Sequence, residues 1–441
     1  MSVGCHVRSG ALVVLLLSVV ISPDIASPES GDQEPLRLDG WRGDLEQVYE
    51  KLIATHPDPF TRVTRHAFDS AFRALRDNLV QMDDDEIRVN LVRLLGMIGD
   101  GHTRIHGARL TELWYPVRIE RFSDGLFVTA VSPEYRDLLG AEVLKIGAHP
   151  AGVVFDSVGS IISADNQYGR DYFTPAYITM VSIMAGLHLT DSPDALRLVI
   201  RHRDGDTVSV GVSAGPYASD DFLSWFWHSN GVPAEQSIRP IDVDPSGAVA
   251  RWTNRDKNYW YTYIDTLNTV YFAFNQCQDA PNETFADFNT GMWDFIDTHD
   301  VGTLIIDLRD NLGGTNSIVM PLIYETIKHE KINTPGHLFV VVGRKTWSAA
   351  LHCATWLERH THAVFVGEPT ASPPNHFADP KTSTLPHSGL LLMVSRYQWQ
   401  NGWPWDDRPW IEPEIRVDPA SDDYFRLTDP VLDSIRAFRA R

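Results

Sequence analysis

The 441 residues of this chain include 38 Lys and Arg against 58 Asp and Glu, which gives a formal net charge of −20. At about 150 residues per domain, this length predicts two to three domains. A net charge of this sign opposes attraction to nucleic acid and to anionic membrane surfaces, and therefore argues against both as partners. Hydrophobic residues make up 43% of the chain and charged residues 22%, which is typical of a folded globular protein.

The first 26 residues differ from the rest of the chain. Arg8 is followed by an apolar run over residues 11–21, and small residues surround Ala26. The run is about half the roughly 20 residues that a bilayer span requires, so it predicts a secretory signal peptide cleaved near Ala26. The alternative is an uncleaved membrane anchor. With the signal peptide removed, we expect an exported protein, periplasmic or extracellular, without a stable membrane span.

Two cysteines remain after this segment, because Cys5 lies inside it. Cys277 and Cys353 can form a disulfide in an oxidising compartment or remain as two buried thiols, and the sequence leaves both open. No Cys-x-x-Cys pair is present, and His360 and His362 have no acidic or cysteine partner at ligand spacing. We therefore expect no metal site and no cofactor.

Helical periodicity dominates residues 40–112, which we interpret as a helical cap domain. Phe68, Phe72 and Leu75 recur at steps of four and three residues, the spacing of one face of an amphipathic helix. The segment ends in Gly99-Asp-Gly-His-Thr103, where two glycines break the helix.

Short β-strand patterns follow over residues 113–215. The predicted strands are 116–120, 125–131, 142–146 and 196–201. Residues 138–150 resemble a segment of PDZ domains, so we interpret this region as a PDZ-like domain. Residues 216–250, rich in Trp, Ser, Pro and Gly, are interpreted as a connecting segment.

Apolar strand patterns alternate with helical patterns over residues 251–441, which predicts a layered α/β domain. The predicted strands are 259–264, 269–274, 303–308, 337–342, 363–366 and 389–394.

One of these strands runs into glycines at Gly313 and Gly314. Glycines after a strand allow the backbone to turn so that N–H groups face a cleft, where they can stabilise an oxyanion. A plain strand-to-loop turn explains the same pattern.

Ser348 stands where the strand 337–342 gives way to a predicted helix over 349–358. A hydroxyl at such a junction is exposed beside free helix N–H groups, as a nucleophile requires. The alternative is an ordinary N-cap, which serine also favours.

Four separated motifs together resemble the tail-specific (C-terminal-processing) serine protease family, in its tricorn-core-like branch. Residues 99–103 resemble the family's D-x-H-T, 305–314 its I-D-L-R-x-N-x-G-G, 343–350 its T-x-S-A-(A/G), and 367–370 its G-E-x-T. The resemblance implies an α/β fold with a crotonase-like catalytic domain over 251–441, an N-terminal helical cap and a PDZ-like domain. Two features depart from the family: Trp347 is bulkier than expected, and residues 371–374 stand where the family usually has glycines.

The resemblance also implies site residues. Ser348 would be the nucleophile and His102 the general base, with Asp406 as first and Asp407 as second choice for the acid that orients it. His376 is an alternative base. A Ser/Lys dyad is poorly supported, because the nearest Lys after position 370 is Lys381.

The oxyanion hole would be formed by the N–H of Ala349 and that of Gly313 or Gly314. The predicted function is an exported serine peptidase that cleaves peptide or protein substrates through an acyl-enzyme. Two alternatives stay open: a noncatalytic peptide-binding protein on the same scaffold, and a hydrolase of small esters or amides. The oligomeric state is not predicted.

Overall fold

The computed structural model describes residues 30–216, 239–240 and 249–440, so the predicted signal peptide and most of the predicted connecting segment lie outside the described residues. Within these ranges, no helix combines the length and the apolar character needed to cross a membrane.

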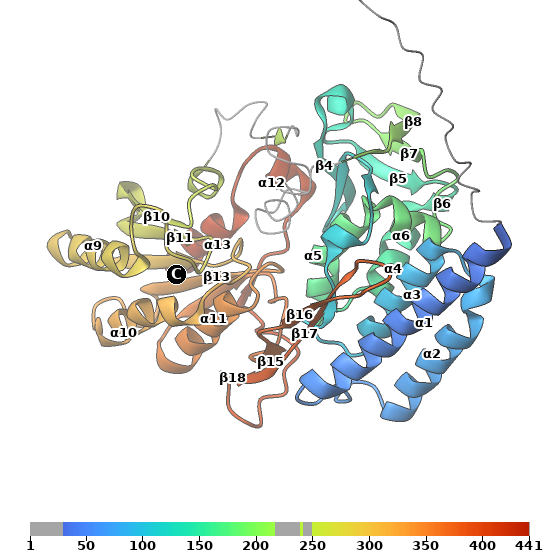
Figure 1. Cartoon of the computed structure of the whole chain (residues 1–441). Coiled ribbons are helices and arrows are strands. Elements are labelled where there is room, and N and C mark those ends of the chain that lie inside the picture. Colours follow the sequence, from blue (N-terminus) through green and yellow to red (C-terminus); the bar gives the residue numbers. More distant parts are fainter. Residues whose placement is uncertain (1–29, 217–238, 241–248, 441) are drawn as a thin grey trace, which may run out of the picture.

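Three helices form the N-terminal layer, on the right in Figure 1: α1 (Ser30–Thr55), α2 (Arg65–Asn78) and α3 (Asp84–Gly96). Their starts are encoded locally. The Thr64 hydroxyl caps α2, and Asp83 and Glu86 form a reciprocal capping box at α3. After α3, Gly99 adopts a φ of +70°, a conformation that favours glycine, and the chain turns into the loop that carries His102.

The following unit is an antiparallel sheet packed against helices. Its strands lie in the order β3 (Val117–Phe122), β4 (Gly125–Val131), β5 (Glu142–Ile146), β7 (Ala195–Arg201) and β8 (Thr207–Ser213), and β6 (His149–Pro150) pairs with β5. The short strands β2 (Leu113–Trp114) and β9 (Gly215–Pro216) pair beside it. The helices α4 (Ala151–Ile161), α5 (Gln167–Ile178) and α6 (Val181–Gly186) were not expected from the sequence. Because α5 is buried on nearly all sides and contains Pro175, it lacks the amphipathic period that would have indicated it.

A largely parallel sheet organises the C-terminal half. Its strands run in the order β10 (Tyr259–Ile264), β11 (Thr269–Phe274), β12 (Thr303–Asp307), β13 (Leu338–Val342), β14 (Val364–Gly367) and β19 (Ile415–Arg416). Only β10 is antiparallel to its neighbour.

Helices cover both faces of this sheet. The helices α9 (Phe285–Thr298), α10 (Met320–Lys328) and α11 (Ala349–His360) share one core with Ile306 and Val340. The helix α13 (Pro430–Arg439), which follows the short α12 (Ser421–Phe425), packs on the opposite face with Ile305 and Val341. The strands are therefore apolar on both faces, as in other buried parallel sheets.

A hairpin from the C-terminal half reaches across to the N-terminal half. It consists of β16 (Lys381–Thr384) and β17 (Leu391–Val394), and β17 pairs with β1 (Arg104–Ile105), directly after the His102 loop. A second ribbon, β15 (Asn375–Ala378) with β18 (Tyr397–Gln400), lies beside it (Figure 1). Leu385 and Leu392 join the same core cluster as the N-terminal helices and the antiparallel sheet. The pairing of β17 with β1 and the common core cluster thus hold the two halves together.

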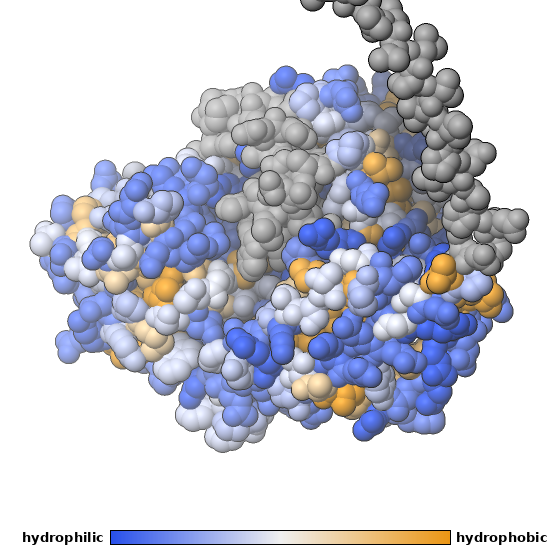
Figure 2. Space-filling view, viewed as in Figure 1, coloured by the Kyte–Doolittle hydropathy of each residue, from blue (hydrophilic) through white to orange (hydrophobic). Residues whose placement is uncertain are grey.

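The surface over α1 and α2 is mostly hydrophilic, with apolar side chains in small separate groups (Figure 2). This agrees with the burial of Leu45, Val48 and Leu52 of α1, which face the core.

Candidate active site

Ser348 occupies a strained position between β13 and α11. Its φ of 55° and ψ of −125° lie in a region that L-residues with a side chain rarely adopt. Such strain costs on the order of 1–3 kcal/mol and is typical of functional sites. The side chain makes no capping hydrogen bond to α11. Ser348 is thus the N-cap of α11 by position only, and its hydroxyl remains available for another partner.

That partner is His102, which lies 246 positions away in the sequence. The Nε2 atom of His102 is 3.2 Å from the Oγ atom of Ser348. The imidazole is 5% exposed, and burial, as the largest effect, lowers its pKa to about 3. A neutral ring with a free Nε2 lone pair can accept a hydrogen bond from the serine hydroxyl.

The predicted acids do not lie beside this histidine. The Asp406 carboxylate pairs with Arg408 at 2.9 Å, and Arg408 also pairs with Glu358. Asp407 is exposed. Both assignments are wrong, because a neighbouring arginine pairs with the first carboxylate and the second is exposed to solvent.

The carboxylate nearest to His102 belongs to Asp100 of the same loop. Its Oδ1 is 4.0 Å from His102 Nδ1 and accepts the backbone N–H of His102 at 2.9 Å. Its Oδ2 accepts the Thr103 hydroxyl at 2.6 Å and faces His56 Nε2 at 3.2 Å. Since the backbone N–H of Asp58 donates to His56 Nδ1, His56 Nε2 carries the proton that it donates to Asp100.

These donors keep Asp100 charged although it is 1% exposed. Burial raises the pKa of Asp100, but the hydrogen bond from His56, the nearby His102 ring and the hydroxyl donors outweigh it and hold the pKa below its ordinary value. The loop therefore presents a negative charge next to the histidine that faces Ser348.

His376 also lies close to this centre but has no contact with the serine hydroxyl among the described hydrogen bonds. Its ring is stacked 6.1 Å from that of His102, and its Nδ1–H donates to the carbonyl oxygen of Pro373 at 3.2 Å. His352, one turn after Ser348 on α11, lies 5.2 Å from His376. Burial lowers the pKa of His376 to about 4 and that of His352 to about 2.

The glycine turn brings candidate oxyanion donors to the serine. A Cβ atom on Gly313 would lie 2.7 Å from both the Ala349 nitrogen and the Ser348 Cβ, so only glycine fits. The N–H of Gly313 donates to the Asn311 side chain at 2.8 Å. Of the two predicted glycines, Gly314 is therefore the one whose N–H, like that of Ala349, has no partner within the described part of the chain.

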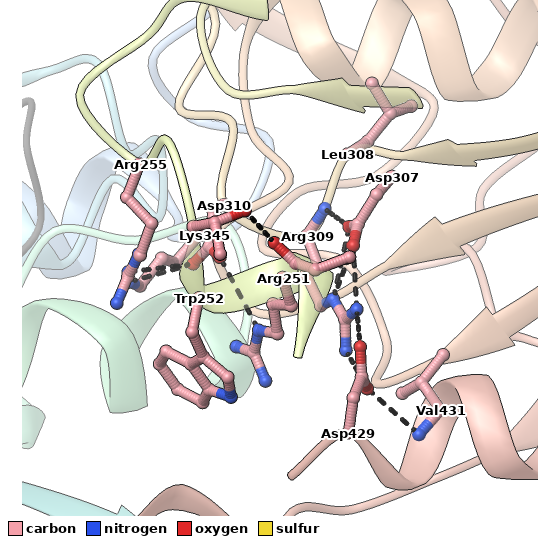
Figure 3. Close-up of polar contacts among 12 residues, drawn as sticks. Arg251, Trp252, Arg255, Asp307, Leu308, Arg309, Asp310, Lys345, Asp429 and Val431 are labelled. Atoms are coloured by element: carbon pink, nitrogen blue, oxygen red, sulfur yellow. Dashed lines mark hydrogen bonds and ion pairs between the residues drawn. The ribbon is translucent and has the colours of Figure 1, made fainter. Parts of the chain in front are cut away.

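A buried ion-pair network fixes the loop that carries these glycines (Figure 3). Arg309 bridges Asp307 at the end of β12 and Asp429 before α13, with distances of 2.7 Å and 2.8 Å. The hydroxyl of Tyr271 donates to Asp307 at 2.6 Å. The adjacent Asp310 pairs with Lys345 in the loop before Ser348, at 3.2 Å. Charged pairs thus hold both loops of the site in place.

Several residues at this centre were missed by the sequence analysis. Trp347 is stacked on His102, and Asp165 accepts hydrogen bonds from Trp347 and from Ser372. Trp347 was noted only as a bulky residue before Ser348, and Asp165 carries no local signal because it belongs to the unpredicted turn between α4 and α5. Cys277 and Cys353 are free and buried. No group of three or more His, Cys, Asp or Glu side chains in the described ranges is arranged to hold a metal ion.

No family model and no curated protein matches this sequence. Solved structures do share its fold, an α/β architecture that combines helices with several sheets.

Mature CPAF complexed with lactacystin aligns over 92% of this chain and 98% of its own, with a TM-score of 0.63 and 12% sequence identity. A CPAF mutant aligns over 92% and 97%, with a TM-score of 0.65 and 12% identity. The photosystem II D1 C-terminal processing protease also matches, over 88% and 96% at 12% identity, but its TM-score of 0.38 is too low to support an argument. At these identities the likeness establishes the fold alone.

Proposed function

We propose that this chain is an exported serine peptidase of the tail-specific, tricorn-core-like family, acting through an acyl-enzyme on Ser348. The observation that carries the proposal is the 3.2 Å approach of a neutral, buried imidazole to a strained serine hydroxyl. The overall likeness to CPAF supports it. In this proposal residues 251–441 are a crotonase-like catalytic domain and residues 113–215 a PDZ-like domain.

In the first step, Ser348 Oγ attacks the carbonyl carbon of the peptide bond while His102 Nε2 takes the hydroxyl proton. The carbonyl π electrons move onto oxygen, and the N–H groups of Gly314 and Ala349 stabilise the resulting oxyanion. The C–N bond then breaks, and the protonated His102 gives its proton to the leaving amine. Water then attacks the acyl carbon while His102 takes its proton, and the carboxyl product is released as Ser348 regains a proton from His102.

Asp100 is the carboxylate that supports His102 in this scheme. When His102 takes up the proton, it becomes an imidazolium 4.0 Å from a carboxylate that is held ionised. The attraction stabilises the charge developed in the transition state and offsets part of the burial that disfavours it.

A fluorophosphonate probe tests the proposal. We expect it to label the protein, with loss of labelling and of peptide hydrolysis in Ser348→Ala and retention of both in Ser160→Ala, an exposed serine on α4. His102→Ala should lose labelling and His376→Ala should keep it. The reverse pattern would make His376 the base.

Unchanged hydrolysis in a folded Ser348→Ala protein would overturn the nucleophile assignment. A wild-type protein that neither labels nor turns over peptides would instead support a binding protein. Hydrolysis of small esters without cleavage of any peptide in a library would support an esterase or amidase.

A further inference from the structure

No carboxylate hydrogen bond sets the plane of the His102 ring. Nδ1 of His102 is buried without a hydrogen bond of ordinary geometry within the described residues, and the nearest carboxylate oxygen lies at 4.0 Å. The backbone of Phe377 also lies beside the ring and raises its pKa. In most Ser-His-Asp centres a carboxylate at this atom fixes the ring.

Trp347 lies flat against that imidazole. The ring centroids are 3.9 Å apart and the ring planes differ by 12°. Trp347 is 2% exposed and directly precedes Ser348. One short segment thus carries both the hydroxyl that faces His102 Nε2 and the surface on which the ring rests.

The indole is itself held from several sides. Its Nε1–H donates to Asp165 Oδ2 at 3.4 Å, and that carboxyl oxygen also accepts the Ser372 hydroxyl at 2.7 Å. The edge of Phe173 packs at 5.7 Å and 82°, and the Arg104 guanidinium lies 5.4 Å from the indole centroid. The indole cannot turn away without breaking these contacts, so it is a rigid platform.

We propose that Trp347 is a positioning residue for the reaction: its indole face orients His102 toward Ser348 and stabilises the imidazolium that forms during catalysis. The inference rests on the proposed function. A cation over the face of an indole is attracted to the negative face of the ring, and such a contact is strengthened where water is excluded. The charged and titratable groups near His102 are Asp100 and Arg104 on its own segment, His376 on β15 and His352 on α11, with Asp165 behind the indole.

The test compares Trp347→Phe, which keeps an aromatic face, with Trp347→Leu, which keeps only apolar bulk. Both remove volume, and the proposal predicts that kcat follows the retention of an aromatic face rather than the volume lost. We expect Trp347→Leu to lower kcat and the rate of fluorophosphonate labelling by about tenfold or more, with KM changed less than twofold. Trp347→Phe should retain kcat within about threefold of the wild type.

Trp405→Leu, at a site that is 76% exposed, is the matched control and should behave as the wild type. Circular dichroism establishes that each variant is folded, and if Trp347→Leu does not fold, Trp347→Met takes its place. Equal losses in the Phe and aliphatic variants, or no loss in either, would overturn the inference. Either result leaves the proposed function intact as long as the wild type is labelled at Ser348, whereas an unlabelled wild type defeats the proposed function itself.

Discussion

At the residue scale, the loop 99–103 contains two of the groups on which the proposed reaction depends. Asp100 receives the backbone N–H of His102, the Thr103 hydroxyl and the His56 imidazole. Asp100 lies two residues before His102 and between two glycines, so its carboxylate can both fix the loop and face the His102 ring.

Asp100→Asn tests this role. The amide keeps the shape but removes the negative charge, so the imidazolium loses its neighbouring counter-charge, and we expect kcat to fall by about a hundredfold or more with little change in KM. Steady-state kinetics on a peptide substrate measure both. A larger loss in Asp406→Asn than in Asp100→Asn would contradict the assignment, since Asp406 is paired with Arg408.

Sequence reasoning identified Ser348 and His102 as partners through the motif resemblance, although 246 positions separate them. It failed for the acid because it looked for the carboxylate in a late segment, whereas the one nearest to His102 is Asp100 of the same motif. A local signal did exist at Asp406: Arg408 stands two residues later, and such a pair neutralises the carboxylate. His56 has no comparable signal, since its partner Asp100 is 44 positions away.

At the element scale, the hairpin of β16 and β17 stabilises the loop of the proposed base. Besides the pairing of β17 with β1, the backbone N–H of Ser395 donates to the Thr103 hydroxyl at 3.0 Å. The Thr103 hydroxyl in turn donates to Asp100. Hydrogen bonds therefore connect the end of the hairpin to the carboxylate beside His102.

Leu392→Ala should separate this local role from general stability. Leu392 is 0% exposed in β17, and the cavity should lower the free energy of unfolding by about 2 to 5 kcal/mol. Leu322→Ala, on α10 and equally buried, should cost a similar amount. Because only Leu392 lies on the strand paired with the His102 loop, we expect kcat under folding conditions to fall in Leu392→Ala alone. Urea titrations and kinetics measure the two effects, and equal kcat values would refute the link.

The central strands of the parallel sheet were predictable, since each is an apolar run bounded by turns, and β12 and β13 are buried along their whole length. The two-residue edge strand β19 was not predicted. The pairing of β17 with β1 was not predictable. A four-residue strand in a hairpin carries no pattern that indicates pairing with two residues nearly 290 positions earlier, because such long-range contacts depend on the shape of both halves.

At the scale of the whole molecule, buried histidines make stability depend on pH. Burial lowers the pKa values of His102, His106, His352 and His376 to about 3, 4, 2 and 4. In an unfolded chain they titrate near 6.5, so below that pH the unfolded state binds more protons and is favoured. Burial raises the pKa of Asp165 to about 7, so below that pH this carboxyl holds a proton in the folded state. Acidification through Asp165 therefore favours the folded state, but the four histidines together outweigh this single group.

We therefore expect the free energy of unfolding to fall by about 3 kcal/mol for each pH unit below pH 6. Urea unfolding at pH 6.5, 6.0 and 5.5 measures this slope. His352→Leu removes one of the four groups and should make the slope shallower. A free energy of unfolding that stays constant or rises on acidification would contradict the neutral state of these histidines.

The pairing of Arg309 with Asp429 has a consequence for the order of synthesis. Arg309 holds the glycine loop beside Ser348, but its second carboxylate comes from a residue made 120 positions later. A growing chain that already contains Ser348 and His102 still lacks this counter-charge, and a buried guanidinium with one partner missing is costly. We therefore expect the nascent chain to lack the proposed activity until translation has passed residue 429.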